Sequence, residues 1–341
     1  MSKTIVVLLL LIIGCVGGVF IENKTHVLGL FIKKPVSDSI VSTVDSLALK
    51  WKPEFKLIEI RSQADGEIQK AYFYPSTAKE PQPLIVSLHS WSWDYRQEDT
   101  LAELSKEKNI NYIHPDFRGA NNTKNACCSE LVIADIDAAI DYAIVHGNVD
   151  TSKIYVTGRS GGGYATLASF MKAKHKIKKF SAWVPLADLV KWYEQTKARK
   201  LKYAAEILLC TGSLNGELNK EVAMEKSPMY WRTPAEKFDY SMLDIYVGIY
   251  DGLESNSPIP ITQSINFYNK LLQDMAATDS SAYIADSVKL RLLEYEKPLG
   301  DFGKIADRDV CLVKQYKNLR ITFFTGGHEM LQQFAFDELM K

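Results

Sequence analysis

Residues 153–172 read KIYVTGRSGGGYATLASFMK, a strand pattern followed by a helical pattern, and this stretch determines the fold class. Between the two patterns, residues 158–162 form G-x-S-x-G, which places a nucleophile on a sharp turn between strand and helix. Glycines flank the serine because side chains there would collide with the neighbouring strand and helix. A phosphate-binding loop is the alternative, but no Lys-Ser or Lys-Thr pair follows the glycines. We therefore predict that Ser160 is a nucleophile.

Short apolar runs on both sides of this motif, most of them separated by helical patterns, predict a parallel sheet flanked by helices. The runs are residues 83–88, 111–114, 153–157, 180–184, 244–247 and 319–323. An Asp-Gly turn at residues 65–66 predicts an antiparallel hairpin of residues 57–64 and 67–74. Residues 130–146 have a helical period with isoleucines on one face, and Asp135 on the opposite face is expected to be solvated.

The 341 residues are enough for one large α/β domain or two smaller ones, and we expect a single catalytic domain over residues 50–341. In residues 188–237 the strand rhythm gives way to helical, aromatic-rich sequence, which predicts a cap inserted over the sheet. A second insertion, residues 275–317, separates the last two predicted strands. The candidates for the substrate pocket are the aromatic residues Trp93, Trp192 and Tyr193.

A serine nucleophile needs a base and an orienting acid, which in this type of fold follow it in the order acid and then histidine. Two histidines lie beyond Ser160. His175 ends the helix after the nucleophile, about 20 Å away, and is out of reach. His328, just after the last predicted strand, is therefore the expected general base, and Asp251, after the strand before it, is the expected acid. The rivals of Asp251 are Glu254, Asp301, Asp307 and Asp309.

The negative charge that develops on a substrate carbonyl needs two hydrogen-bond donors. One is expected to be the backbone amide of Gly161, directly after the nucleophile. The other is expected from the loop after the strand 83–88, where we choose the amide of Trp91 over that of Ser90. His89 in the same loop is expected to shape the loop rather than take part in the chemistry.

The composition is that of a globular protein. Hydrophobic residues make up 46% and charged residues 24% of the chain, which excludes a disordered, collagen-like or disulfide-scaffold protein. The 41 Lys and Arg balance the 41 Asp and Glu, so we expect no nucleic-acid partner. No cysteine pair has zinc-ligand spacing, so we expect no zinc site, and the expected serine, acid and histidine need neither a metal nor an organic cofactor. Cys127, Cys128, Cys210 and Cys311 could form a disulfide whose pairing the sequence does not assign.

Residues 1–20 are expected to be a signal peptide or a lipoprotein signal outside the fold. An unbroken apolar run, residues 5–13, leads into Ile-Ile-Gly-Cys, which resembles a bacterial lipobox in which Cys15 receives lipid. Two alternatives remain open: ordinary cleavage near residues 17–18, and retention of residues 5–21 as a membrane anchor. All three place the catalytic body outside the cytoplasm, in the periplasm or at the cell surface, with membrane attachment through Cys15 if it is lipidated.

An ordered set of motifs resembles the α/β-hydrolase superfamily and, within it, the catalytic domain of prolyl-oligopeptidase-like serine peptidases. The motifs are Leu88-His89-Ser90-Trp91, Asp116-Phe117-Arg118-Gly119, Gly158-Arg159-Ser160-Gly161-Gly162-Gly163, Asp251-Gly252 and Gly326-Gly327-His328-Glu329. The resemblance covers the chain from Leu84 onward and implies an α/β-hydrolase fold with a helical cap insertion. Two departures stand out. Only 83 residues precede Leu84, where these peptidases usually carry a large β-propeller, and Ser90 and Trp91 replace the glycines common in the family's oxyanion loop.

Together these features predict an exported serine hydrolase that cleaves an ester or amide bond through a Ser-His-Asp triad and an acyl-enzyme. The resemblance favours a peptidase of the prolyl-oligopeptidase type, acting on a short peptide or another small molecule. A carboxylesterase, or a carbohydrate esterase of the acetyl or feruloyl type, is the alternative, because residues 188–237 contain no motif that selects between them. A non-catalytic binding protein of the same fold is the second alternative, which the intact order of Ser, Asp and His disfavours.

Overall fold

A computed structural model of the protein describes residues 51–253 and 257–341. Within it, Pro53–Lys341 is one compact unit. The signal sequence expected at residues 1–20, including Cys15, and the rival acid Glu254 lie outside the described residues. In the part of the chain that is described, no helix is both long enough and apolar enough to span a membrane.

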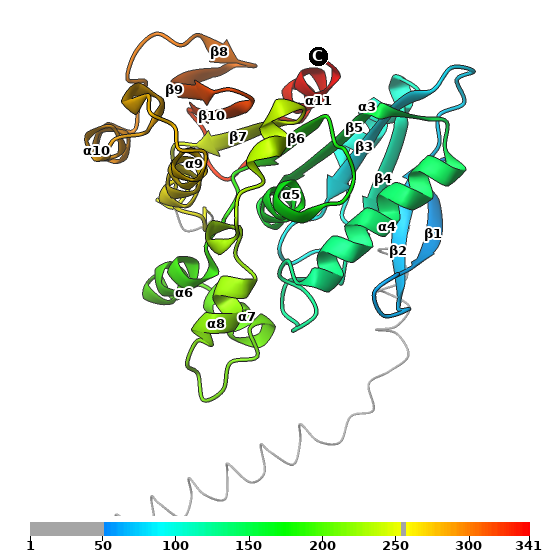
Figure 1. Ribbon diagram of the computed structural model, residues 1–341, viewed down its shortest axis with the longest axis horizontal. Coiled ribbons are helices and arrows are strands. Elements are labelled where there is room, and N and C mark those ends of the chain that lie inside the picture. The colour runs from blue at the N-terminus through cyan, green and yellow to red at the C-terminus, as the bar shows by residue number, and fades with distance from the viewer. Residues whose placement is uncertain (1–50, 254–256) are drawn as a thin grey trace, which may run out of the picture. The chain divides into compact units, whose positions relative to one another are not determined.

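Within the described residues, ten strands form one sheet in the order β1-β2-β4-β3-β5-β6-β7-β10-β9-β8 (Figure 1). Strands β4, β3, β5, β6, β7 and β10 run parallel, whereas β1, β2, β9 and β8 pair antiparallel. Every predicted strand is present, and β1 and β2 form the predicted hairpin, which confirms the α/β class. The strands are β1 (Lys56–Arg61), β2 (Ile68–Tyr74), β3 (Gln82–Leu88), β4 (Asn111–Pro115), β5 (Val149–Arg159), β6 (Lys179–Trp183), β7 (Met242–Gly248), β8 (Lys304–Ile305), β9 (Arg308–Tyr316) and β10 (Leu319–Phe324).

Helices connect most of the parallel strands. The α-helices are α3 (Thr100–Glu107), α4 (Glu130–His146), α5 (Gly161–Lys172), α6 (Leu189–Ala198), α7 (Tyr203–Cys210), α8 (Lys220–Glu225), α9 (Thr262–Asp274), α10 (Asp286–Tyr295) and α11 (Gln332–Met340). The short 3-10 helices are η1 (Pro228–Tyr230), η2 (Ala235–Asp239) and η3 (Ser280–Ala282). Helices α4 and α5 contact each other in front of the sheet in Figure 1, and α3 contacts α11. Helix α4 has the bounds predicted for it.

Side chains that alternate between the two faces of the sheet build two hydrophobic cores. Ala182 of β6 and Ile245 of β7 belong to the larger core, to which α4, α5 and α9 contribute. Their neighbours Trp183 and Tyr246 stack in the smaller core, with ring centroids 4.2 Å apart, and Phe324 of β10 and part of α11 join them. The sheet thus has a hydrophobic core on each face. In such folds, ligand-binding and active sites lie in the loops at the carboxyl ends of the parallel strands.

Asp135 of α4 is buried, so the prediction that it is solvated is wrong. Its carboxylate pairs with the buried guanidinium of Arg118, whose Nη2 lies 3.1 Å from Asp135 Oδ1. The same guanidinium donates to Asp65 Oδ1 in the hairpin turn, over 2.9 Å. Helical periodicity identifies the residues that share a face, but it does not reveal that an arginine from another element will cover that face.

The insertion of residues 188–237 contains α6, α7 and α8 and begins at the carboxyl end of β6. A disulfide joins Cys210, the last residue of α7, to Cys127 in the loop before α4, with 6.3 Å between their Cα atoms. It therefore attaches the insertion to the body of the domain. The second insertion, residues 275–317, contains α10, β8 and β9, and β9 pairs with β10 at the edge of the sheet.

We expect Cys210→Ser to lower the free energy of unfolding by about 2–5 kcal/mol, because the disulfide closes a loop of 83 residues in the unfolded chain. Urea unfolding with and without a reducing agent measures this loss. Cys311→Ser is the matched control, since Cys311 is a buried free thiol. An equal loss in the two variants would show that the cross-link contributes no stability of its own.

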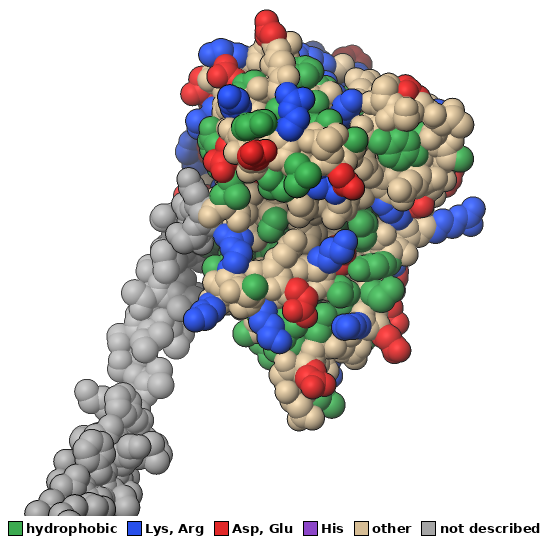
Figure 2. Space-filling model, turned by 90° about the vertical axis from the view of Figure 1, so that its left-hand side faces the viewer, with side chains coloured by type: hydrophobic (Ala, Val, Ile, Leu, Met, Phe, Trp, Pro, Cys, Tyr) green, Lys and Arg blue, Asp and Glu red, His purple; other side chains and the backbone are tan. Residues whose placement is uncertain are grey.

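The face of the molecule in Figure 2 carries charges of both signs. Lys and Arg side chains are interspersed there with Asp and Glu side chains, and hydrophobic side chains lie between them. Neither sign forms a continuous area on this face, in keeping with the equal numbers of basic and acidic residues in the chain.

Candidate active site

Ser160 stands on the turn between β5 and α5, with φ 61° and ψ −119°. This left-handed φ is unfavourable for a residue with a side chain, and the Ser160 amide is held by the carbonyl oxygen of Trp183 at 2.9 Å. The turn is tight on both sides. A Cβ on Gly158 would lie 2.5 Å from the backbone of Gly162, and a Cβ on Gly162 would lie 2.0 Å from the carbonyl oxygen of Leu88. Glycine is therefore required at both positions for the serine to stand above the sheet edge.

Asp251 and His328 form a direct pair, with 2.7 Å between Asp251 Oδ2 and His328 Nδ1. The other carboxylate oxygen accepts the backbone amide of Ile259 at 3.1 Å. Asp251 is almost fully buried, and burial raises the pKa of its carboxyl, while the hydrogen bond from His328 acts in the opposite direction. If Asp251 is ionised it can only accept, and His328 then donates from Nδ1, which leaves Nε2 to face the substrate side.

The loop that carries His328 is packed against the end of β7. A Cβ on Gly248 would lie 2.0 Å from the carbonyl oxygen of Gly327, and the Tyr250 amide donates to the carbonyl oxygen of Gly326 at 2.9 Å. Because β5, β6, β7 and β10 are neighbours in the sheet, the loops after β5, β7 and β10 all lie at one edge. Among the described residues, no hydrogen bond joins the Ser160 hydroxyl to His328. Such catalytic hydrogen bonds often tighten only when a substrate is bound.

The backbones of Gly161 and Trp91 lie close together next to the nucleophile. A Cβ on Gly161 would lie 2.3 Å from the Trp91 nitrogen, so the two backbones are in direct contact. Gly161 is the first residue of α5, where amides have no partner within the helix. The amide of Ser90 is occupied, since it donates to Gln97 Oε1 at 2.8 Å. Trp91 has no such acceptor within the described chain, which favours its amide over that of Ser90 as the second oxyanion donor.

His89 is buried at the start of the same loop. Its ring stacks on Phe117, with 3.8 Å between centroids. Nε2 lies 2.6 Å from the carbonyl oxygen of Asp116, and Nδ1 lies 3.0 Å from that of Ser90. Burial lowers the pKa of His89. These contacts join the loops after β3 and β4, which is the shaping role expected for His89.

The three pocket candidates have different surroundings. Trp93 is 54% exposed. Trp192 is buried, and its indole donates to the carbonyl oxygen of Pro258 at 3.1 Å. Tyr193 is also buried, with its hydroxyl 3.3 Å from the carbonyl oxygen of Gly216. The structure brings Trp192 against Trp91, with 4.7 Å between ring centroids.

Within the described residues, the other candidates form no hydrogen bond or ion pair with Asp251 or His328. Asp301, Asp307 and Asp309 are exposed in the second insertion. His175 follows the C-terminal end of α5, whereas Ser160 precedes its first residue, and His175 Nε2 lies 3.3 Å from Asp141 Oδ1. Among the described residues, no group of three or more His, Cys, Asp or Glu side chains has the arrangement of a metal site.

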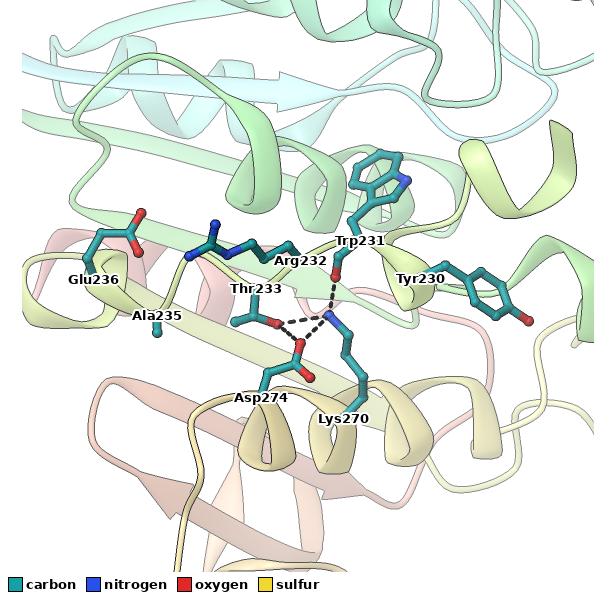
Figure 3. A pocket seen from close by; sticks show the side chains of 8 residues that line it. All are labelled: Tyr230, Trp231, Arg232, Thr233, Ala235, Glu236, Lys270 and Asp274. Carbon is teal, nitrogen blue, oxygen red and sulfur yellow. Dashed lines mark hydrogen bonds and ion pairs between the residues drawn. The ribbon is translucent and has the colours of Figure 1, made fainter. Parts of the chain in front are cut away.

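A pocket of about 520 Å³ lies between η2 and the end of α9 (Figure 3). Its Lys270 ammonium is already bound by the carbonyl oxygen of Trp231, by Thr233 Oγ1 at 2.8 Å and by Asp274 at 2.8 Å. None of the residues that line this pocket belongs to the turn of Ser160 or to the loops of Asp251 and His328. It is therefore a feature separate from the candidate active site.

Sequence reasoning missed Gln97 and Glu206, which hold the loop after β3. Gln97 binds the Ser90 amide, and Glu206 of α7 accepts a hydrogen bond from the Trp91 indole. The sequence signal at Glu206 is a Lys-Glu pair with Lys202 at i,i+4 spacing, and such a pair is usually a solvated one. That signal could not have identified the contact with Trp91.

We expect Asp116→Asn to be more stable than the wild type by about 1–2 kcal/mol above pH 7 and to lose this advantage below pH 4. Burial, followed by the neighbouring Asp94, raises the pKa of Asp116 from 3.8 to about 6. The folded state thus binds the proton more tightly than the unfolded state, and stability falls as the pH rises from about 4 to about 6. Urea unfolding across this pH range measures the difference. The exposed Asp239→Asn is the control, and a gain that does not vary with pH would contradict the assignment.

Comparison with known proteins shows which family and which solved structures this chain resembles. Residues 101–233 match the model of the prolyl oligopeptidase family. Pyrococcus horikoshii acylaminoacyl peptidase superposes with a TM-score of 0.51 at 17% identity, over 68% of this chain and 37% of the peptidase. Prolyl oligopeptidase B from Galerina marginata gives a TM-score of 0.51 at 14% identity, over 72% of this chain and 37% of that protein. The chain has the α/β-hydrolase fold.

A third solved structure is similar to this α/β-hydrolase, a puromycin-hydrolyzing peptidase of Mycobacterium tuberculosis. The TM-score is 0.50 at 18% identity, over 64% of this chain and 34% of the peptidase. This chain therefore spans little more than a third of the length of the peptidases it resembles. No curated protein matches its sequence. The family match confirms the predicted resemblance to prolyl-oligopeptidase-like serine peptidases.

Proposed function

We propose that this α/β-hydrolase is an exported serine peptidase of the prolyl-oligopeptidase type, with Ser160, His328 and Asp251 as its catalytic triad. The observation that carries the proposal is the 2.7 Å pair of Asp251 and His328 at the same sheet edge as the strained turn of Ser160. A buried acid, a histidine with one free nitrogen and a serine on such a turn are the parts of a hydrolase that works through an acyl-enzyme.

The proposed reaction begins when Ser160 Oγ attacks the carbonyl carbon and His328 Nε2 takes the hydroxyl proton. Asp251 stabilises the imidazolium that forms. The carbonyl oxygen becomes an oxyanion, which the amides of Gly161 and Trp91 bind. When the intermediate collapses, His328 returns the proton to the leaving amine, and the acyl group stays on Ser160. Water then attacks the acyl-enzyme by the same route, with His328 as base, and releases the acid.

A short peptide or another small acylated amine is the proposed substrate. The support is the match to the prolyl oligopeptidase family and the fold shared with acylaminoacyl and puromycin-hydrolyzing peptidases. The insertion of residues 188–237 follows β6 and would line the entrance to the site. Because this chain spans little more than a third of those peptidases, its substrate range is a separate question from theirs.

Export is proposed from the apolar run of residues 5–13, and the disulfide of Cys127 and Cys210 supports it, because disulfides persist in oxidising compartments. Attachment to a membrane through lipidated Cys15 is part of the same proposal. Mass spectrometry of the mature amino terminus tests it. A diacylated Cys15 is the expected result, and cleavage near residues 17–18 or an intact terminus would contradict it.

The test of the proposed activity is turnover of a panel of aminoacyl-nitroanilides, acylated amino-acid amides and p-nitrophenyl esters by the purified protein. We expect kcat for the best amide to exceed the uncatalysed rate constant by about 10⁶-fold or more, and kcat/KM to depend on the identity of the residue before the bond. Turnover of the esters with no turnover of any amide would replace the peptidase with an esterase. No turnover together with no reaction of Ser160 with a fluorophosphonate would indicate a binding protein.

A further inference from the structure

Helix α7 of the insertion contacts the side chain of Trp91. The indole Nε1 of Trp91 donates to Glu206 Oε2 over 2.7 Å. Trp91 is almost fully buried and Glu206 is mostly shielded from solvent. A hydrogen bond to a carboxylate in such surroundings is stronger than a neutral or exposed one. This bond therefore joins the insertion to the very residue whose amide is proposed to bind the oxyanion.

The next residue of the loop is held by the same turn of α7. Lys202, just before the helix, donates to Ser92 Oγ over 2.7 Å and pairs with Glu206 at 3.1 Å. Two consecutive loop residues, Trp91 and Ser92, are thus bound to two linked side chains one helical turn apart. The loop after β3 is thus attached to α7 at two neighbouring residues.

Aromatic rings extend this contact to the loop that holds the acid. Trp192 of α6 packs edge to face on Trp91, and Tyr203 of α7 lies 5.1 Å from Trp192 between ring centroids. The Trp192 indole donates to the carbonyl oxygen of Pro258, the neighbour of Ile259, whose amide binds Asp251. The insertion consequently contacts both the oxyanion loop and the loop around the acid.

Helix α7 is itself anchored to the body of the domain. Its last residue, Cys210, forms the disulfide with Cys127. The ammonium of Lys226 donates to the carbonyl oxygens of Cys210 at 2.9 Å and Ala126 at 3.1 Å, which lie on the two sides of that disulfide. Glu206 therefore acts from a fixed support, one turn away from a covalent link.

We propose that Glu206 is a positioning residue, which through the Trp91 indole holds the Trp91 amide in the oxyanion hole. The inference rests on the proposed function. The ring and the amide belong to one residue, and the buried ring is packed against Trp192 and Tyr203, so a shift of the ring that side-chain rotation does not absorb is passed to the amide. Oxyanion stabilisation requires the donor to be in place before charge develops, and a misplacement of about 1 Å can cost a factor of about 100 in rate.

The test compares Glu206→Ala, Glu206→Gln, Trp91→Phe and the double variant Trp91→Phe/Glu206→Ala. For Glu206→Ala we expect kcat to fall about 10-fold or more while KM changes less than about 2-fold. Glu206→Gln can still accept the indole hydrogen and should recover most of the loss. Trp91→Phe removes the indole donor and keeps the amide, so Glu206→Ala should cost nothing more in that background. Glu194→Ala, an exposed glutamate of α6, is the control.

Several results would overturn the role of Glu206. The first is a kcat of Glu206→Ala within about 2-fold of the wild type. The second is a double variant in which the losses of the two single variants multiply. The third is an effect confined to KM, which would indicate that Glu206 contacts the substrate. Thermal melting within a few degrees of the wild type shows that α7 is still folded. The rate of labelling by a fluorophosphonate, whose phosphoryl oxygen occupies the same hole, gives a second readout. If the wild type is not labelled at Ser160, the proposed function fails; if wild type and Glu206→Ala are labelled equally fast, only the positioning role fails.

Discussion

Ser160→Ala is expected to abolish labelling by a fluorophosphonate and to lower kcat for any substrate of the wild type by about 10³-fold to 10⁶-fold. The reason is that the turn between β5 and α5 places this hydroxyl above the sheet edge, next to the backbones of Gly161 and Trp91. Binding and the oxyanion donors would account for the remaining rate. Labelling is read by mass spectrometry of the modified peptide.

Two controls make this result specific. Ser90→Ala changes a neighbouring hydroxyl, which donates to the carbonyl oxygen of Arg159 at 3.3 Å and is not expected to react. A melting curve checks that Ser160→Ala is folded, and relief of the strained φ of 61° is not expected because alanine also carries a Cβ. Labelling that persists in Ser160→Ala would mean that the nucleophile is another residue.

Asp251→Asn is expected to lower kcat by about 10⁴-fold with little change in the fold. The amide side chain can accept the Ile259 hydrogen bond, but it would present an N–H or a neutral oxygen to His328 in place of a carboxylate. The imidazolium formed during the reaction would then lose its stabilising charge, and the ring could adopt the tautomer that has no free Nε2. Initial rates on the best substrate measure the loss.

Asp307→Asn is the matched control for this variant. Asp307 was a rival acid on sequence grounds, and the structure places it exposed in the second insertion. Its substitution is expected to leave kcat within about 2-fold of the wild type. A large loss in Asp307→Asn with none in Asp251→Asn would reverse the assignment of the acid.

Local sequence patterns determined the class of the fold and the places of its strands. The apolar runs of β3 to β7 and β10 are short and bounded by turn residues, and helices of clear period lie between them, so the parallel sheet follows from periodicity. The motif around Ser160 is likewise local. Glycine is required at 158 and 162 because of close contacts within one strand-turn-helix unit and with its neighbouring strand. For this reason the nucleophile was the most direct of the sequence predictions.

The choice of Asp251 and His328 from sequence had a topological basis. Both follow parallel strands, and the carboxyl ends of parallel strands share an edge, so order along the chain already brought them to the same edge as Ser160. Their 2.7 Å contact, in contrast, depends on the close packing of Gly248 against Gly327, which no local pattern describes.

The sequence by itself determined the α/β class and the strand-turn-helix of Ser160, because these depend on residues near one another in the chain, and it predicted the acid and the base from the order of the strands that they follow. Only the tertiary structure decided the pairing of Cys127 with Cys210, the burial of Asp135 under Arg118 and the hold of Glu206 on Trp91. These contacts join residues that are 17 to 115 positions apart. Their partners are selected by how helices, loops and the insertion pack on the sheet, and periodicity does not encode that packing.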